Sequence, residues 1–447
     1  MDAVLLARIQ FAISVGVHYV FPPMTIGLSW LIVGFMYRYW RTGQEVFGKL
    51  ARFWIGVFAL GFASGVATGI VMEFQFGTNW SEYSRFVGDI FGAPLAAEGL
   101  IAFFLESSFL GVLLFGWKRF KPGLHFFASL MVAVGSTMSA FWIIVANSWQ
   151  QTPAGYHLVN GRAELTDFWA AVFNPSTVLR FNHVIVGALL VGSFFMMGIS
   201  AWFVLRDKDR EFARHSFKTA LILAAIVALA QLGFGHAQAV RVWETQPEKL
   251  AAVEGHWETS KGAPILVFGI PDAEEERTKY AIGVPYLMSF LLTGDPKTEI
   301  KGLKEWPRDE RPPLGWTFYP FHIMFLSGVY MILLTAFGIF LMIRKKLWET
   351  RWYIKLVLFT FPVVFLADHC GWIAAEVGRQ PWIVYHLLKT VDAVSPLVTK
   401  TELIASLTMF SIIYALLIFV WLFLLIQKVK AADAAGISGA TDKEVVA

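Results

Sequence analysis

Four side chains that can coordinate a metal ion lie in or beside long apolar stretches of this chain. They are His18, His183, Met324 and Glu376. An ionisable group at membrane depth is costly, so each one is a candidate functional residue. A histidine can also simply bond a neighbouring helix, a methionine can pack, and a glutamate at a helix end can face water. Histidine and methionine are common axial ligands of haem iron, and a His/Met pair suits an electron-transfer haem. We therefore predict haem-based redox chemistry.

Two further carboxylates, Glu98 and Glu106, lie in one apolar stretch. In an α-helix their spacing corresponds to roughly 12 Å along the axis and about 80° around it. Two acids at different depths suit a proton relay. The alternative is a pair of structural carboxyl groups held by hydrogen bonds.

The elements that carry these side chains are predicted to be membrane helices. Of the 447 residues, 56% are hydrophobic, 16% aromatic and only 16% charged, whereas soluble domains average about 25% charged residues. A membrane-spanning helix needs roughly 20 mostly apolar residues. The sequence predicts an all-α, polytopic membrane bundle of about nine helices, with approximate spans 14–36, 53–73, 94–117, 125–146, 182–205, 216–235, 318–343, 354–377 and 403–427.

Basic residues alternate between the connectors of these spans. They cluster in the first, third, fifth and seventh connectors and after the ninth span, as in Lys118, Arg119 and Lys121. Positive charge marks the cytoplasmic side of a membrane. We therefore expect the N-terminus outside and the C-terminus in the cytoplasm.

The chain divides into four predicted parts. Residues 1–235 hold six spans, 236–317 form a long polar connector outside, 318–430 hold three spans, and 431–447 form a disordered cytoplasmic tail. A connector of this length is usually functional or disordered. Residues 248–254 look amphipathic and helical, so part of it should be ordered.

The direction of the spans predicts the depth of the candidate residues. Odd-numbered spans run from the outer side inwards, which places His18, His183, Met324 and Glu98 towards the outer side. The eighth span runs outwards, so Glu376 near its end lies there too. The potential ligands thus gather at one depth.

Five motifs along the chain are specific in their residues and spacing. They are 371–382 (GWIAAEVGRQPW), 65–80 (GVATGIVMEFQFGTNW), 91–99 (FGAPLAAEG), 103–107 (FFLES) and 268–272 (FGIPD). Together they resemble subunit I of the cytochrome bd family of quinol oxidases. The resemblance extends along almost the whole chain.

This resemblance implies three haems near the outer face. His183 and Met324 match the axial ligands of a low-spin haem b. His18 matches the ligand of one high-spin haem, and Glu376 matches the carboxylate ligand of the other. These two are a high-spin haem b and a haem d, or a further haem b in its place. The assignment of each ligand to one of them stays open.

The resemblance also implies roles for basic residues and for the long connector. Arg379 and Arg8 match basic residues near haem propionates, a charge pairing that makes physical sense. Lys249 and Glu254 fall on the positions implicated in quinol oxidation, where a carboxylate can accept the quinol proton. The connector is of the short type found in this family.

A proton path is implied as well. Glu98 and Glu106, with Ser139, match the path proposed for the family. One departure is His322, which stands where the family often has arginine two residues before the methionine ligand. That substitution weakens any charge argument built on the arginine.

The predicted function is that of the haem-carrying subunit of a terminal quinol oxidase. Quinol is oxidised at the outer side and its electrons pass first to the His183/Met324 haem. O₂ is reduced to water at the haems of His18 and Glu376 with cytoplasmic protons that pass Glu106 and Glu98. This builds a proton-motive force without a pump.

A second membrane subunit is expected in the cytoplasmic membrane of a bacterium or archaeon, and a small single-span subunit is a further candidate partner. The net charge of +4 gives no sign of nucleic-acid binding. The alternatives are a haem-bearing quinol dehydrogenase or electron shuttle that does not react with O₂, and a transporter with structural histidines.

Overall fold

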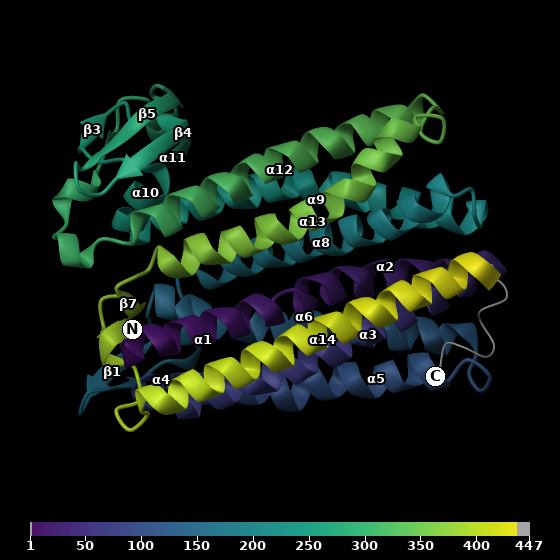
Figure 1. Ribbon diagram of the computed structural model, residues 1–447, viewed down its shortest axis with the longest axis horizontal. Coiled ribbons are helices and arrows are strands. Elements are labelled where there is room, and N and C mark those ends of the chain that lie inside the picture. Colours follow the sequence, from purple (N-terminus) through teal and green to yellow (C-terminus); the bar gives the residue numbers. More distant parts are fainter. Residues whose placement is uncertain (1, 436–447) are drawn as a thin grey trace.

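The computed structural model describes residues 2–435 and consists mainly of long helices (Figure 1). Among these residues, nine helical segments are long and apolar enough to cross a membrane, which confirms the predicted number. They are α1 (Ala3–His18) with α2 (Phe21–Thr42), α3 (Glu45–Thr78), α4 (Ser81–Ala97) with the π-helix η1 (Glu98–Phe103) and α5 (Phe104–Phe115), α6 (Pro122–Gln151), α8 (Thr177–Leu205), α9 (Arg210–Thr245), α12 (Leu314–Ile343), α13 (Arg351–Val377) and α14 (Lys400–Ala435).

Shorter elements occupy the connectors. The helices are α7 (Phe168–Val172), α10 (Pro247–Glu254) and α11 (Leu287–Thr293), with 3₁₀ turns at Leu303–Glu305, Arg308–Glu310 and Thr390–Asp392. The strands form antiparallel pairs: β1 (Tyr156–Val159) with β2 (Arg162–Leu165), β3 (Ser260–Lys261) with β6 (Glu299–Ile300), β4 (Ile265–Asp272) with β5 (Arg277–Val284), and β7 (Trp382–Val384) with β8 (Leu388–Lys389).

The membrane helices are longer than their apolar cores. The third span begins at Ser81, not near residue 94, so Glu98 lies about 25 Å into the span by helical rise. Polar residues make up much of this added part of the helix, so the position of Glu98 relative to the outer surface stays a prediction. The first span is divided in two. Pro22 and Pro23 occupy the first turn of α2, where the missing N–H of proline is tolerated, and they would interrupt the interior of a single helix.

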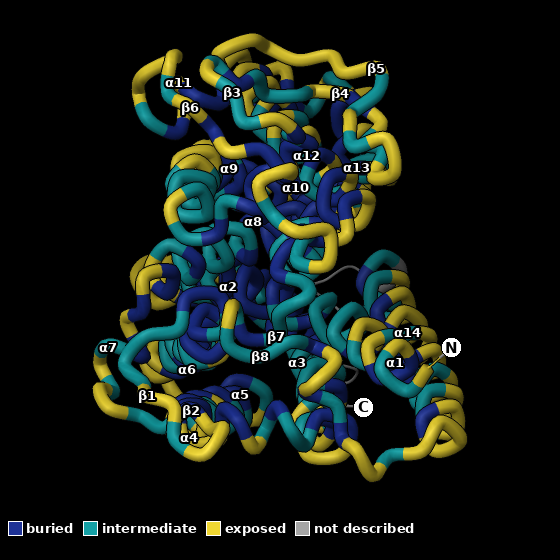
Figure 2. Tube along the Cα trace, turned by 90° about the vertical axis from the view of Figure 1, so that its left-hand side faces the viewer, coloured by how far each residue is buried: buried dark blue, intermediate teal, exposed yellow. Residues whose placement is uncertain are grey.

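Two groups of helices lie side by side (Figures 1 and 2). One group consists of α8, α9, α12 and α13, which we call the four-helix group. The other contains α2, α3, α6 and the α4–η1–α5 span, with α1 and α14 packed along its side. The largest hydrophobic core cluster runs through both groups and includes Trp54, Phe194, Phe217 and Tyr353.

The two groups meet closely where α2 crosses α8. A Cβ atom on Gly27 would lie 2.3 Å from the carbonyl oxygen of Ala188, and one on Gly192 would lie 2.5 Å from the Cα of Gly27. Any larger side chain would push these helices apart. Small residues at such crossings let membrane helices pack backbone to backbone.

The short elements α10, β1–β2, β4–β5 and β7–β8 gather at one end of the bundle, where α1 also begins (Figure 1). We call this the loop end. The end of α14 lies at the opposite end, as nine spans require. The predicted part boundaries shift, because α9 continues to Thr245 and α12 begins at Leu314. Helix α14 continues to Ala435, so the tail predicted from residue 431 is helical at its start. Residues 436–447 lie outside the described part of the chain.

Candidate functional site

His183 and Met324 lie in the four-helix group, on α8 and α12. Both helices pack against α9 and α13. The amide Nε2 of Gln231 on α9 lies 3.3 Å from each ring nitrogen of His183, while the Oε1 atom of Gln231 is buried and lacks a partner within the described residues. Met324 Sδ would lie 2.9 Å from a Cβ atom on Gly371, so glycine at this position leaves room for the thioether. A histidine and a methionine on separate helices of one bundle, beside an unpaired polar atom, fit the axial ligands of a low-spin haem.

His18 is the last residue of α1, and its ring is fixed by α3. Its Nδ1 atom lies 2.9 Å from Thr68 Oγ1. The Thr68 hydroxyl donates its own proton to the carbonyls of Ser64 and Gly65, so it accepts from His18. This arrangement puts the imidazole proton on Nδ1 and leaves the Nε2 lone pair available to a metal. A Cβ atom on Gly69 would lie 3.2 Å from His18 Cε1, so glycine at this position avoids a tight contact with the ring.

Glu376 lies in the last turn of α13 and is bonded by side chains from other elements. Its Oε1 atom accepts hydrogen bonds from Asn147 Nδ2 at 3.1 Å and from Gln151 Nε2 at 3.2 Å, both on α6. Its Oε2 atom accepts from Arg379 Nη2 at 2.6 Å. Arg180 Nη2 on α8 lies 3.7 Å from Oε1. Glu376 therefore faces the bundle, and the alternative of a glutamate that merely faces water does not apply.

Buried positive charge surrounds this carboxylate. The side chains of Arg180, Arg379 and Lys249 are all buried. The nearby carboxylates are those of Glu376 and of Glu248, which is also buried. Burial, reinforced by Arg180, holds the pKa of Lys249 well below its usual range. The Nε atoms of Arg180 and Arg379 are buried without partners in the described part of the chain. Two buried arginines with unpaired N–H groups fit the anionic propionates of a haem.

Lys249 connects α10 to this cluster. Its Nζ atom donates to Gln151 Oε1 at 2.7 Å and to Gln246 Oε1 at 2.6 Å. Gln151 in turn donates to Glu376. One glutamine therefore contacts both a predicted quinol residue and a predicted metal ligand.

Glu254, the second predicted quinol residue, ends α10 and points elsewhere. Five residues along a helix correspond to about 140° of rotation from Lys249. Glu254 is buried, and its Oε2 atom has no partner among the described residues. Burial raises the pKa of Glu254 to about 8. A carboxyl group with a pKa near the working pH is suited to proton transfer.

Glu98 and Glu106 both face α6. Ser139 Oγ donates to Glu98 at 2.6 Å, and Ser136 Oγ donates to Glu106. The predicted offset of about 80° between the two acids is wrong, because η1 lies between them as a π-helix. A π-turn takes up one extra residue, or about 100° of rotation, which returns both carboxylates to one face. Ser136 and Ser139 are three residues apart and share one face of α6.

One predicted site residue lies apart from the cluster around Glu376, and several residues of the cluster were not predicted from the sequence. Arg8 is exposed on α1, so of the two arginines assigned to propionates only Arg379 lies in the cluster. The partners that the sequence did not reveal are mostly on α6: Ser136, Asn147, Gln150 and Gln151, with Arg180 on α8. The three amides lie past residue 146, the predicted end of the span. Their position so close to an apolar stretch is the signal that could have identified them.

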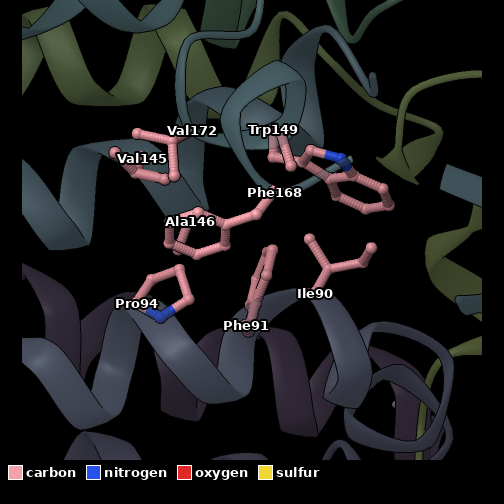
Figure 3. Close-up of a pocket in the computed structure, with 9 residues that line it drawn as sticks. Ile90, Phe91, Pro94, Val145, Ala146, Trp149, Phe168 and Val172 are labelled. Atoms are coloured by element: carbon pink, nitrogen blue, oxygen red, sulfur yellow. The ribbon is translucent and has the colours of Figure 1, made fainter. Parts of the chain in front are cut away.

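A small cavity of about 10 Å³ lies between α4, α6 and α7 (Figure 3). Its lining is apolar and includes Phe91, Pro94, Val145 and Phe168. A space of this size holds at most a single water molecule. It is therefore a packing defect and not a substrate site.

A multi-pass helical bundle that places partly buried histidine, methionine and glutamate side chains together with buried arginines that carry unpaired N–H groups has the features of a membrane haem protein. The family model described as cytochrome bd terminal oxidase subunit I matches residues 6–433, and the chain belongs to this family.

Known relatives agree with this assignment. Cytochrome bd ubiquinol oxidase subunit 1 of Bacillus subtilis (strain 168) is 43% identical over 96% of this chain and 94% of its own length. Cytochrome bd-II ubiquinol oxidase subunit 1 of Escherichia coli (strain K12) is 34% identical over 97% of this chain and 98% of its own. The solved structure of bd oxidase from Geobacillus thermodenitrificans superposes with a TM-score of 0.91 at 32% identity, covering 96% of this chain and 99% of that one.

These findings confirm the predicted enzyme class. The chain is subunit I of a terminal quinol oxidase, a haem-carrying oxidoreductase of membrane electron transport that works with a partner subunit. The two alternatives, a shuttle that does not react with O₂ and a transporter, are set aside.

Proposed function

We propose that a membrane quinol is oxidised at the loop end, at α10. Lys249 and Glu254 are the residues that we assign to quinol oxidation. Glu254 serves as the proton acceptor, because its buried carboxyl has a pKa raised to about 8 and an unpaired oxygen. Lys249 orients the quinol and is itself held by Gln151 and Gln246.

We further propose which residues hold the haems. His183 and Met324 hold a low-spin haem b. His18 and Glu376 hold a high-spin haem b and a haem d, or a further haem b in place of haem d. When bound, the haems carry the electrons of the quinol to O₂ and provide the site of its reduction to water. The chain supplies Thr68, which fixes the proton of His18 on Nδ1, and Arg379, which bonds Glu376 and suits a propionate.

The protons for water are proposed to enter from the end opposite the loop end and to pass Glu106 and then Glu98. The observation that carries this proposal is the alignment along α6. Ser136 and Ser139 bond the two acids on one face, and Asn147 on the same helix bonds Glu376. By helical rise, Ser139 lies about 12 Å from Asn147, and Ser136 about 4.5 Å further. Against a hydrocarbon core of about 30 Å, this ladder spans roughly half of the membrane.

This directionality explains energy storage without a pump. If the loop end is the outer side, quinol releases its protons outside, and water formation takes up protons from the cytoplasm. Each charge moved across the membrane stores about 2.3 kcal/mol per 100 mV. The chain would then reside in the cytoplasmic membrane of a bacterium or archaeon, with its N-terminus outside. Its partners would be a second membrane subunit and, as a further candidate, a small single-span subunit.

Reconstitution of the purified complex tests this function. In liposomes, quinol oxidation should consume O₂ and generate a potential that is negative on the side from which protons are taken. The reduced-minus-oxidised spectrum should contain low-spin bands and high-spin bands that shift with CO. O₂ consumption without a potential would refute the vectorial proton path. A spectrum without haem bands would refute the ligand assignments.

A further inference from the structure

His322 ties the connector between α9 and α12 to a membrane helix. It is buried on α12, two residues before Met324. Its Nε2 atom lies 2.9 Å from the carbonyl oxygen of Leu266 on β4, and its Nδ1 atom lies 2.9 Å from the carbonyl oxygen of Phe318. A carbonyl only accepts, so the bond to β4 requires the ring to donate from Nε2.

The hairpin formed by β4 and β5 (Ile265–Val284, the β4–β5 hairpin) contacts the end of α10. Thr278 Oγ1 on β5 donates to the carbonyl of Gly255 at 2.7 Å, and Trp257 Nε1 donates to Thr278 Oγ1 at 3.2 Å. Gly255 caps α10 with a left-handed φ of 62°, which favours glycine. It directly follows Glu254. The hairpin therefore fixes the backbone next to the proposed proton acceptor.

Phe318 completes this contact. Its ring lies 3.9 Å from the His322 ring, measured between centroids. Phe318 also approaches the cap of α10, because a Cβ atom on Gly255 would lie 2.9 Å from Phe318 Cε2. A continuous row of contacts therefore runs from His322 through Phe318 to the cap of α10.

Much of the rest of the hairpin is exposed. The exposed fractions of Phe268, Tyr280 and Ile282 are 53%, 77% and 65%. A segment with few buried contacts opens at low free energy. The position of the hairpin therefore depends on its few specific attachments. Within the described part of the chain, the hydrogen bond from His322 to Leu266 joins the hairpin to a membrane helix close to the proposed haem ligand.

We propose that His322 is a positioning residue for quinol oxidation. By bonding Leu266, it holds the β4–β5 hairpin against α12, and the hairpin then sets the position of Glu254. This inference rests on the proposed quinol role of Glu254. In this proposal His322 acts by donating a hydrogen bond to the hairpin. It stands at the position where the family often has an arginine.

Two substitutions separate this role from others. His322→Gln places an amide donor near the position of Nε2 and should keep the bond to Leu266. His322→Asn places it near Nδ1 and should keep only the contact with Phe318. In the complete oxidase complex, His322→Asn should raise the quinol KM about tenfold, as expected for the loss of one buried hydrogen bond, with kcat within about twofold. Amide hydrogen exchange in the β4–β5 hairpin should accelerate by a similar factor. His322→Gln should resemble the wild type in both measurements.

Two controls report on the haems. The low-spin spectrum of His322→Asn should be unchanged, and so should O₂ consumption driven by ascorbate with tetramethyl-p-phenylenediamine, which reduces haem directly. Wild-type KM and exchange in His322→Asn would overturn the proposal. Equal defects in both variants, or a lost low-spin spectrum, would assign His322 to folding or to the haem and would also overturn it. A separate Glu254→Gln complex with wild-type quinol kinetics would instead refute the proposed quinol site itself.

Discussion

Replacing Gln151 by leucine should uncouple α10 from Glu376. Gln151 Oε1 accepts from Lys249 Nζ at 2.7 Å, and Gln151 Nε2 donates to Glu376 Oε1 at 3.2 Å. Leucine has a similar size, so the packing of α6 is preserved while both bonds are lost. The backbone carbonyl of Gln151, which accepts from Gln246 Nε2, is retained.

The size of the effect follows from the partners that remain. A hydrogen bond to a charged group contributes about 1.5–3 kcal/mol. Lys249 keeps Gln246, and Glu376 keeps Asn147 and Arg379, so we expect the lower value. About 1.5 kcal/mol corresponds to roughly a tenfold fall in kcat/KM for quinol. The low-spin haem spectrum should not change.

A double-mutant cycle with Lys249→Met provides the assay. Steady-state quinol oxidation is measured for the wild type, both single variants and the double variant. If Gln151 acts by holding Lys249, the double variant should lose little more than Lys249→Met alone. Fully additive losses would show that the two residues act independently and would refute the reasoning.

Three further predictions concern single residues. Because burial raises the pKa of Glu254 to about 8, its carboxyl is mostly protonated below that pH and ionised above it. Quinol oxidation should therefore rise with pH through about 8, and Glu254→Gln should flatten this pH–rate profile; a retained rise would exclude Glu254 as the base. Met324→Leu should selectively alter the low-spin haem spectrum, and an unchanged spectrum would disprove its assignment as a ligand. Glu106→Gln should slow turnover by roughly 10²-fold, whereas Ser108→Ala, on the exposed side of the same helix, should not; equal rates in both would rule out the proton path.

The fold was largely predictable because membrane insertion depends on local composition. Each span is apolar over enough residues to cross a bilayer, and this can be counted along the chain. The exact ends were less predictable. Ser81 begins the third span because polar residues at the loop end continue the helix beyond its apolar part. Pro22 and Pro23 divide the first span, an effect that hydropathy alone does not report.

The sequence predicted which residues form the candidate site, but only part of how they are arranged. His18, His183, Met324 and Glu376 could be singled out because ionisable or metal-binding groups in apolar stretches are few. Their partners could not, because a hydrogen bond between helices depends on how each helix is rotated and how deeply it sits.

The sequence by itself determined that this chain is a membrane bundle, and it singled out candidate metal ligands and two intramembrane acids, since hydrophobicity and ligand chemistry belong to the residues themselves. Only the tertiary structure decided what these residues face. The π-turn at η1 turns Glu98 and Glu106 to the same side of their span, where both bond serines of α6. Gln151 joins Lys249 to Glu376. His322 bonds a strand that is far away in the chain. These contacts arise from helix rotation and packing between distant segments, and neither is encoded in local sequence.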